Sequence, residues 1–183
     1  MRAEIFIGGR GGQGILFMGY VLGLAASKMG YYVVQTESYT PETRGGLTTS
    51  ELIISDEGPI DELRVEEADL AVLMFKGLGL RYSHVIRRDA TVLIDSTFVD
   101  RRDVLSAWSV IEVPASSIAL RRFGTPLPGN SVMLGALAEV TGLVTVKALR
   151  EALKEVSRGP WLKKNLEALE LGVEAVRGLT RPS

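Results

Sequence analysis

The sequence predicts an α/β fold: a mostly parallel sheet flanked by helices, with a helical layer at the C-terminal end. A short apolar stretch near the N-terminus runs into a glycine-dense turn and then into a segment with an apolar stripe. Strand-like and helix-like stretches then alternate, and from Asn130 onward the pattern is helical. This succession is typical of α/β folds that carry extra helices. Because no repeat or linker interrupts the 183 residues, we expect one domain spanning 1–183.

The first predicted unit is a strand at Ile5–Ile7, a turn at Gly8–Gly14 and a helix at Ile15–Met29. The helix is predicted from apolar residues at three- and four-residue steps, and Gly30 is placed to end it. The G-x-G-x-x-G spacing that opens a Rossmann-like βαβ unit is met by Gly9, Gly11 and Gly14. Glycine permits such a turn, and the free N–H groups at the start of the helix suit an anion.

The later elements are predicted by the same patterns. Tyr31–Thr36 is β-branched and aromatic, and is expected to form a right-handed parallel crossover with the first strand. Further strands are predicted at Leu47–Ser55, Ala68–Phe75, Thr91–Asp95 and Ser109–Val113. Further helices are predicted at Gly79–Arg88, Ser117–Phe123, Val132–Thr141, Val146–Ser157 and Trp161–Val176. The expected helix caps are Asn130 or Ser131, and Thr145.

Composition narrows the class of protein. Lys and Arg number 21 against 22 Asp and Glu, so no net field attracts nucleic acid or an anionic membrane. The longest apolar run, Leu70–Phe75, is far shorter than the roughly 20 residues of a membrane-spanning helix. A strand that begins by Ile5 leaves no room for a signal peptide, and the absence of cysteine suits the cytoplasm, where we expect the protein. Without cysteine, thiol catalysis and thiolate-held iron–sulfur clusters are excluded from this chain.

Ligands of open parallel sheets bind beyond the carboxyl ends of the strands, where the glycine turn and the loop Glu37–Gly46 are expected. The candidate cofactor-binding residues there are Gly9, Arg10, Gly11, Gly12, Gln13, Gly14, Arg44 and Gly45. Arg44 suits a bidentate grip on phosphate or carboxylate. It can equally pair with Glu42 while the glycines only form a turn, and the sequence leaves both interpretations open.

Other residues argue against several kinds of site. Ile15 follows Gly14 where a P-loop has lysine, which disfavours a P-loop NTPase. Glu37 is the one acidic residue placed to bind a ribose, and a solvated loop carboxylate is the alternative. His84, the single histidine, is expected on an exposed helix without partners for a metal site or a catalytic triad. Asp95 is a polar candidate or a helix cap. No catalytic residue and no metal ligand is therefore predicted.

Three stretches together resemble one protein family. They are GGRGGQG at 8–14, QTESYTPETRGG at 35–46 and NSVMLG at 130–135. They are similar to the G-x-G-G-Q-G turn, the S-Y-G-P-E-x-R-G-G loop and an Asn-led helix start in the gamma subunit of the 2-oxoacid:ferredoxin oxidoreductase family. The resemblance spans nearly the whole chain. The departures are Arg10, which adds a cation to the turn, and Thr40, where the family usually has glycine.

The resemblance implies a subunit of an enzyme that oxidatively decarboxylates a 2-oxoacid to an acyl-CoA. In that family, thiamine diphosphate with Mg and the iron–sulfur clusters bind to partner subunits, ferredoxin takes the electrons and coenzyme A is the co-substrate. The missing cysteines and the missing G-D-G thiamine signature agree with this division of labour. The chain is then expected to be a scaffold beside the thiamine site that lines the coenzyme A path and is not catalytic alone. Its expected partners are alpha and beta subunits, and the resemblance leaves open whether a delta subunit is a further partner.

The resemblance also bears on the substrate, and two other interpretations remain. The stretch PETRGG at 41–46 looks more like the 2-oxoglutarate or branched-chain types than the pyruvate type. As an alternative, the turn can serve a stand-alone Rossmann-type nucleotide-binding module or an NAD(P)-dependent enzyme that uses Glu37. It can also belong to a regulatory interaction domain in which the glycines only permit close packing of helix on strand.

Overall fold

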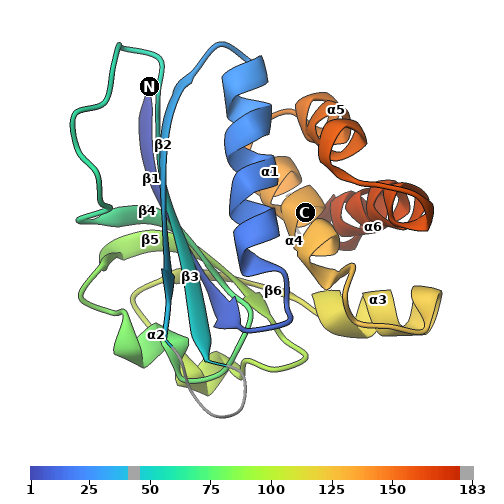
Figure 1. Cartoon of the computed structure of the whole chain (residues 1–183). Coiled ribbons are helices and arrows are strands. Elements are labelled where there is room, and N and C mark those ends of the chain that lie inside the picture. Colours follow the sequence, from blue (N-terminus) through green and yellow to red (C-terminus); the bar gives the residue numbers. More distant parts are fainter. Residues whose placement is uncertain (41–45, 178–183) are drawn as a thin grey trace.

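The computed structural model describes residues 1–40 and 46–177 (Figure 1). Within them, one six-stranded sheet has the order β2-β3-β1-β4-β5-β6. The strands are β1 (Arg2–Arg10), β2 (Tyr32–Tyr39), β3 (Leu47–Ser55), β4 (Ala68–Leu73), β5 (Ile86–Asp95) and β6 (Ser109–Val113). The helices are α1 (Ile15–Lys28), α2 (Leu78–Arg81), α3 (Ala115–Phe123), α4 (Gly129–Thr141), α5 (Val146–Val156) and α6 (Pro160–Arg177), with a 3-10 helix at Arg101–Asp103. The α/β fold with a mostly parallel sheet and C-terminal helices is thus confirmed.

One strand runs against the rest of the sheet. β1, β4, β5 and β6 pair in parallel, whereas β3 is antiparallel to both of its neighbours, β1 and β2. β2 therefore points the same way as β1 but is separated from it by β3. The predicted crossover from the first to the second strand is interrupted because β3, which follows β2 along the chain, pairs with β1 over its whole length. This insertion places β2 one strand farther from the glycine turn.

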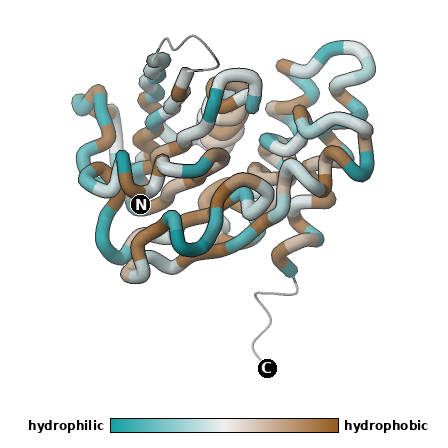
Figure 2. The backbone as a smooth tube through the Cα atoms, turned by 90° about the horizontal axis from the view of Figure 1, so that it is seen from below, coloured by the Kyte–Doolittle hydropathy of each residue, from teal (hydrophilic) through white to brown (hydrophobic). Residues whose placement is uncertain are grey.

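Helices cover the two faces of the sheet unequally. α1, α3, α4, α5 and α6 lie on one side, and the four-residue α2 lies on the other (Figure 1). In β1, the buried Ile5 and Ile7 belong to the core under the helices, whereas Phe6 belongs to a second core with Trp108. This is the alternation that a strand buried on both faces requires. Figure 2, coloured by the hydropathy of each residue, shows hydrophobic residues gathered in the middle of the molecule.

The C-terminal helices are held by an unusually close crossing of α4 and α6. A Cβ added at Gly135 would lie 2.0 Å from the carbonyl oxygen of Leu169. One added at Gly172 would lie 1.8 Å from the carbonyl oxygen of Val132. The two backbones approach this far because both glycines lack a side chain. The crossing sets the position of the starts of α4 and α6, which share a pocket with the start of α1.

Several sequence predictions are confirmed in detail. The strands at Leu47–Ser55 and Ser109–Val113 have the predicted bounds. Thr145 caps α5, because its Oγ1 accepts a hydrogen bond from the backbone N–H of Ala148 at 3.1 Å. Among the residues that the structure describes, no helix is both long and apolar enough to cross a membrane.

The helix predicted at Gly79–Arg88 is wrong. α2 ends at Arg81, and β5 begins at Ile86. The reason is pairing with the sheet: the carbonyl of Val85 accepts a hydrogen bond from the N–H of Ala68 at 2.7 Å, and Ile86 lies opposite Ala68 in β4. Ile86 is therefore buried as the first residue of β5, and Val85 before it is half-buried in a turn whose backbone bonds to β4.

The caps predicted for the next helix are also wrong. α4 begins at Gly129 and has Pro128 at its N-cap, so Asn130 and Ser131 lie inside its first turn. The Nδ2 atom of Asn130 instead lies 3.5 Å from the carbonyl oxygen of Gly14, at the start of α1. A long-range contact thus replaces the local cap that the sequence suggested.

Candidate functional site

The glycine run divides between a strand and a turn. Gly8 and Gly9 pair with β3 as part of β1, so the turn starts only after Arg10. A Cβ added at Gly9 would lie 2.3 Å from Cδ1 of Ile15, which shows that the start of α1 packs directly on the strand. Gly14 is the N-cap of α1 with φ 73°, a left-handed conformation that favours glycine. The turn is therefore built to bring the helix start to the carboxyl edge of the sheet.

Gln13 closes this turn with its side chain. Its Oε1 accepts a hydrogen bond from the N–H of Arg10 at 2.7 Å, and its Nε2 donates to the carbonyl of Met74 at 2.7 Å. The side chain thus ties the end of β1 to the residue that follows β4. The amide oxygen and one N–H of this predicted binding residue are used within the chain, so its evident role is to shape the turn.

Arg10 faces the β4 side of the turn. Its guanidinium carbon lies 5.1 Å from the centroid of the Phe75 ring, and the Phe75 ring in turn lies 6.2 Å from that of Phe98. A cation held over an aromatic face keeps its charge while it is positioned. The other predicted arginine, Arg44, lies outside the described residues, as does Gly45.

The start of α1 is electrostatically suited to an anion. Its N-cap offers no side-chain hydrogen bond, and its first turn contains no acidic residue. The partial positive charge of the helix end is therefore not neutralised locally. Gly12, just before it, is exposed, whereas the N–H of the neighbouring Gly11 donates to the carbonyl of Gly46 at 2.9 Å. Backbone N–H groups at such a position form a ready site for phosphate or carboxylate.

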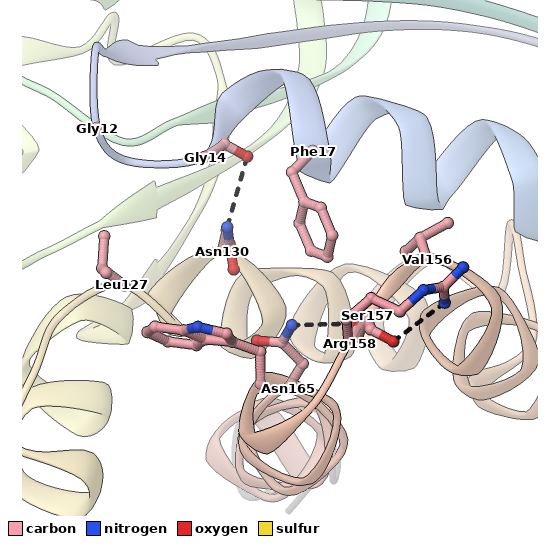
Figure 3. A pocket seen from close by; sticks show the side chains of 10 residues that line it. Gly12, Gly14, Phe17, Leu127, Asn130, Val156, Ser157, Arg158 and Asn165 are labelled. Carbon is pink, nitrogen blue, oxygen red and sulfur yellow. Dashed lines mark hydrogen bonds between the residues drawn. The ribbon is translucent and has the colours of Figure 1, made fainter.

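A pocket of about 330 Å³ opens on the helical side of the turn (Figure 3). We call it the α6 pocket. Its lining residues come from the turn, from α1, from the end of α5, and from α4 and α6 with their preceding loops: Gly12, Gly14, Phe17, Leu127, Asn130, Val156, Ser157, Arg158, Trp161 and Asn165. Figure 3 shows Phe17 pointing from α1 toward α4 and α6, with Asn130 below the Gly14 carbonyl.

Two further pockets meet at the same turn. One, of about 180 Å³, lies on the β4 side and includes Arg10, Gln13 and Phe75. The other, of about 440 Å³, lies on the β3 side and includes Leu16 and Tyr39. Gly12 lines all three pockets. The predicted residues Arg10 to Gly14 thus form a junction between three pockets, whereas Gly9 is buried in β1 and lines none of them. The sequence had indicated only the turn.

Glu37 and His84 do not join this junction. Both line a separate polar pocket that includes Arg64 but none of the turn glycines. Glu37 is exposed on β2, where it accepts a hydrogen bond from Gln35 Nε2 at 3.1 Å. His84 is exposed, as expected, but lies in a turn before β5 and not on a helix. Because β3 separates β2 from β1, the acidic residue and the glycine turn are not arranged as in a dinucleotide site.

Asp95 acts as a local anchor. The residue is fully buried, and its carboxylate accepts hydrogen bonds from the Ser116 N–H, the Ser116 hydroxyl at 2.5 Å and the Thr97 N–H at 3.1 Å. It thereby holds the start of α3, whose N-cap is Pro114, and the turn that follows β5. Among the described residues, no group of three or more His, Cys, Asp or Glu side chains could hold a metal ion.

Sequence reasoning missed the aromatic and amide residues of the α6 pocket. Trp161 and Asn165 lie four residues apart and therefore on one face of α6. That spacing was a usable signal, but it did not show that the face meets Phe17 of α1. Asn130 was noticed only as a cap. Its position beside Gly14 is so close that a Cβ on the glycine would lie 2.2 Å from the Asn130 amide nitrogen.

The chain is similar in sequence and in fold to known proteins of one family. A model of the pyruvate ferredoxin/flavodoxin oxidoreductase family matches residues 4–175. The 2-oxoglutarate synthase subunit KorC of Methanothermobacter marburgensis is 39% identical, and the match covers 96% of this chain and 97% of that protein. The keto/oxoacid ferredoxin oxidoreductase gamma subunit of Geobacter sulfurreducens is 29% identical, with a TM-score of 0.84 over 97% of this chain and 98% of that one.

A larger enzyme shares the fold. The 2-oxoglutarate:ferredoxin oxidoreductase of Magnetococcus marinus, solved with 2-oxoglutarate, coenzyme A and succinyl-CoA bound, is similar with a TM-score of 0.85 at 20% identity. The match covers all of this chain and 32% of that one. The family model and the full-length KorC relative carry the assignment, and the solved structures agree in fold. The chain belongs to the pyruvate ferredoxin/flavodoxin oxidoreductase family, as a gamma-type subunit of a multi-subunit 2-oxoacid:ferredoxin oxidoreductase.

Proposed function

We propose that the chain is a non-catalytic scaffold subunit that packs beside the thiamine site of its partners and whose glycine turn borders the coenzyme A path. The observation that supports the proposal is that the start of α1 and three pockets meet at the carboxyl edge of the sheet. The turn offers a helix start suited to an anion and lies between three pockets, yet the described residues contain no group of three or more His, Cys, Asp or Glu side chains that could hold a metal ion.

The residues that could do chemistry are engaged in structure. Gln13 closes the turn, and Asp95 anchors α3. His84 is exposed and lines a pocket that holds none of the turn glycines. The sequence has no cysteine, so iron–sulfur clusters need another subunit. Thiamine diphosphate, Mg and the clusters are accordingly assigned to alpha and beta partners, with delta as a further partner and ferredoxin as the electron acceptor.

Coenzyme A suits the turn because it carries several phosphate groups. The start of α1 favours such charges, and Arg10 adds a positioned cation. The Magnetococcus enzyme, whose fold contains this one, was solved with coenzyme A bound to that protein. This supports placing a coenzyme A path next to the corresponding fold here.

Exposed apolar side chains next to the turn suit contact with a partner subunit. Leu16 and Tyr20 lie one helical turn apart on α1 and are 37% and 53% exposed. Tyr39, at the end of β2, is 57% exposed and lines the same pocket as Leu16. Aromatic side chains of this kind are enriched at protein interfaces. We place the contact with the thiamine-bearing subunits on this surface.

We infer 2-oxoglutarate as the substrate of the assembled enzyme. Its support is the KorC relative, which is named for 2-oxoglutarate synthase, together with the PETRGG stretch at 41–46. The substrate would bind to the partner subunits. The preference for one 2-oxoacid is therefore measured on the assembled enzyme and not on this chain.

The test uses the assembled enzyme with Arg44→Ala and Arg10→Ala variants of this chain. Each variant should raise the Michaelis constant for coenzyme A by about tenfold, the effect of losing a charge-assisted hydrogen bond of about 1.5 kcal/mol, while the constant for the 2-oxoacid stays unchanged. Arg102→Ala, whose side chain is 89% exposed and lines none of the three pockets at the turn, gives a matched loss of one charge and should leave the constant for coenzyme A unchanged. Unchanged constants for coenzyme A in both arginine variants would contradict the proposed coenzyme A path.

A further inference from the structure

The α6 pocket combines features that point to a flat, polar ring as its occupant. Phe17 enters from α1 and Trp161 from α6, so two aromatic side chains from different helices line one space. Trp161 is 41% exposed, which leaves its ring accessible from the pocket mouth. A volume of about 330 Å³ is at the lower end of the range for small-molecule sites. Aromatic walls of this kind stack on nucleic-acid bases with little dependence on the base.

Two buried amides supply the selectivity that stacking lacks. Asn130 and Asn165 both line the pocket and are each only 7% exposed. Asn165 donates from Nδ2 to the Ser157 hydroxyl at 3.1 Å, but no residue in the described part of the chain donates to its Oδ1. Because Asn165 lines the pocket, this oxygen has acceptor capacity that an N–H group of a ligand can use. The Asn130 Nδ2 has only a long contact of 3.5 Å to the Gly14 carbonyl, so it has donor capacity left.

Positive charge lies at both ends of the pocket. The glycine turn, with the start of α1, forms one end. At the other end, Arg158 is exposed and donates to the backbone carbonyls of Glu155 and Ser157, with no carboxylate partner among the described residues. Lys164 lies 5.0 Å from the Trp161 ring centroid. A ligand here would therefore carry a flat heteroaromatic base together with phosphate.

We propose that the α6 pocket binds the base of an adenine nucleotide, with the phosphates at the glycine turn. Adenine has an amino donor next to a ring-nitrogen acceptor, which is the edge that an asparagine amide recognises. The amino group fits the unpaired Asn165 Oδ1, and a ring nitrogen fits the Asn130 amide N–H. The inference rests on the proposed function for its occupant, because coenzyme A contains an adenosine 3′,5′-bisphosphate. A free adenine nucleotide shares that chemistry, and the test separates the two sources.

The experiment titrates the full chain with ADP, IDP, coenzyme A and 4′-phosphopantetheine by calorimetry. ADP and coenzyme A should bind saturably. IDP, which has a carbonyl in place of the amino group, should bind about tenfold more weakly, and phosphopantetheine, which lacks the base, weaker still. Equal affinities for ADP and coenzyme A would assign a general adenine-nucleotide site. Affinity for coenzyme A at least about tenfold above ADP would assign coenzyme A as the occupant.

Variants tie the binding to the pocket. Trp161→Leu, at an exposed position, should weaken ADP binding about tenfold or more, whereas Trp161→Phe should retain it because a ring remains. Asn165→Ala should remove the preference for ADP over IDP, with thermal unfolding as the check that the variant folds. Glu37→Gln, in the separate polar pocket, is the matched control and should change nothing.

Three results would overturn the proposal: no saturable binding of any adenine compound at about 1 mM, equal binding of ADP and IDP to the unchanged chain, or no effect of Trp161→Leu. The assembled enzyme separates this failure from failure of the proposed function. If Trp161→Leu leaves the Michaelis constant for coenzyme A unchanged while Arg44→Ala raises it, the adenine site is wrong and the coenzyme A path stands. If the chain proves dispensable for the enzyme, the proposed function itself is wrong.

Discussion

The two sides of the start of α1 differ in chemistry although they flank the same turn. On the side of β3 and β2, the nearest side chains are exposed and apolar, such as Leu16 and Tyr39, and the acidic Glu37 belongs to another pocket. On the side of α4 and α6, aromatic rings surround two buried amides. The insertion of β3 between β1 and β2 accompanies the difference: Glu37 of β2 lies in a separate pocket, whereas the C-terminal helices line a pocket together with the turn. The G-x-G-x-x-G spacing is thus found here beside a pocket formed with α4 and α6, and Glu37 at the end of the second strand takes no part in it.

The largest expected effect comes from a substitution that disturbs only the packing of α4 on α6. Gly172→Ala would place a Cβ 1.8 Å from the Val132 carbonyl oxygen, so α4 and α6 must move apart. Alanine normally stabilises a helix interior by about 1 kcal/mol relative to glycine, yet here overpacking should lower the free energy of unfolding by roughly 3 kcal/mol. Urea denaturation measures this change in the free energy of unfolding. Glu174→Ala, exposed on the same helix, should stay within about 0.5 kcal/mol, and equal stability of the two variants would refute the close crossing.

A smaller effect compares a glutamine in the turn, Gln13, with one on β2, Gln35. Gln13→Ala would leave the N–H of Arg10 and the carbonyl of Met74 without the partners that the side chain provides, and should cost about 2 kcal/mol of unfolding free energy. Gln35→Ala on β2 removes bonds to the exposed Glu37 and to the Ser50 hydroxyl, and should cost less than about 1 kcal/mol. Parallel urea titrations give the difference. A costlier Gln35 variant would mean that the turn does not depend on the Gln13 bridge.

How far the sequence predicted the fold follows from the range of the contacts involved. Leu47–Ser55 and Ser109–Val113 were predicted with their bounds because strand composition is a local signal. The segment Gly79–Arg88 was misassigned because Val85 and Ile86 are recruited by β4, a partner that local periodicity does not reveal. The position of β3 between β1 and β2 depends in the same way on pairing between distant segments.

The candidate site was predicted in part for the same reason. The glycines of the turn were recognisable because spacing alone marks them, and Gly14 has the left-handed conformation that the argument requires. Asn165 and Trp161 were missed because their position depends on the crossing at Gly135 and Gly172, which joins helices far from the turn in sequence. The cap predicted at Asn130 was wrong because its amide is used across the fold, near Gly14.

The central claim is that this chain is required by the enzyme without performing its chemistry. Reconstitution with the alpha and beta partners, with and without this chain, tests it through 2-oxoacid-dependent reduction of ferredoxin and formation of acyl-CoA. We predict acyl-CoA formation only in the complete mixture, and no decarboxylation of the 2-oxoacid by the purified chain. Decarboxylation by the chain alone, or full activity of the partners without it, would contradict the account.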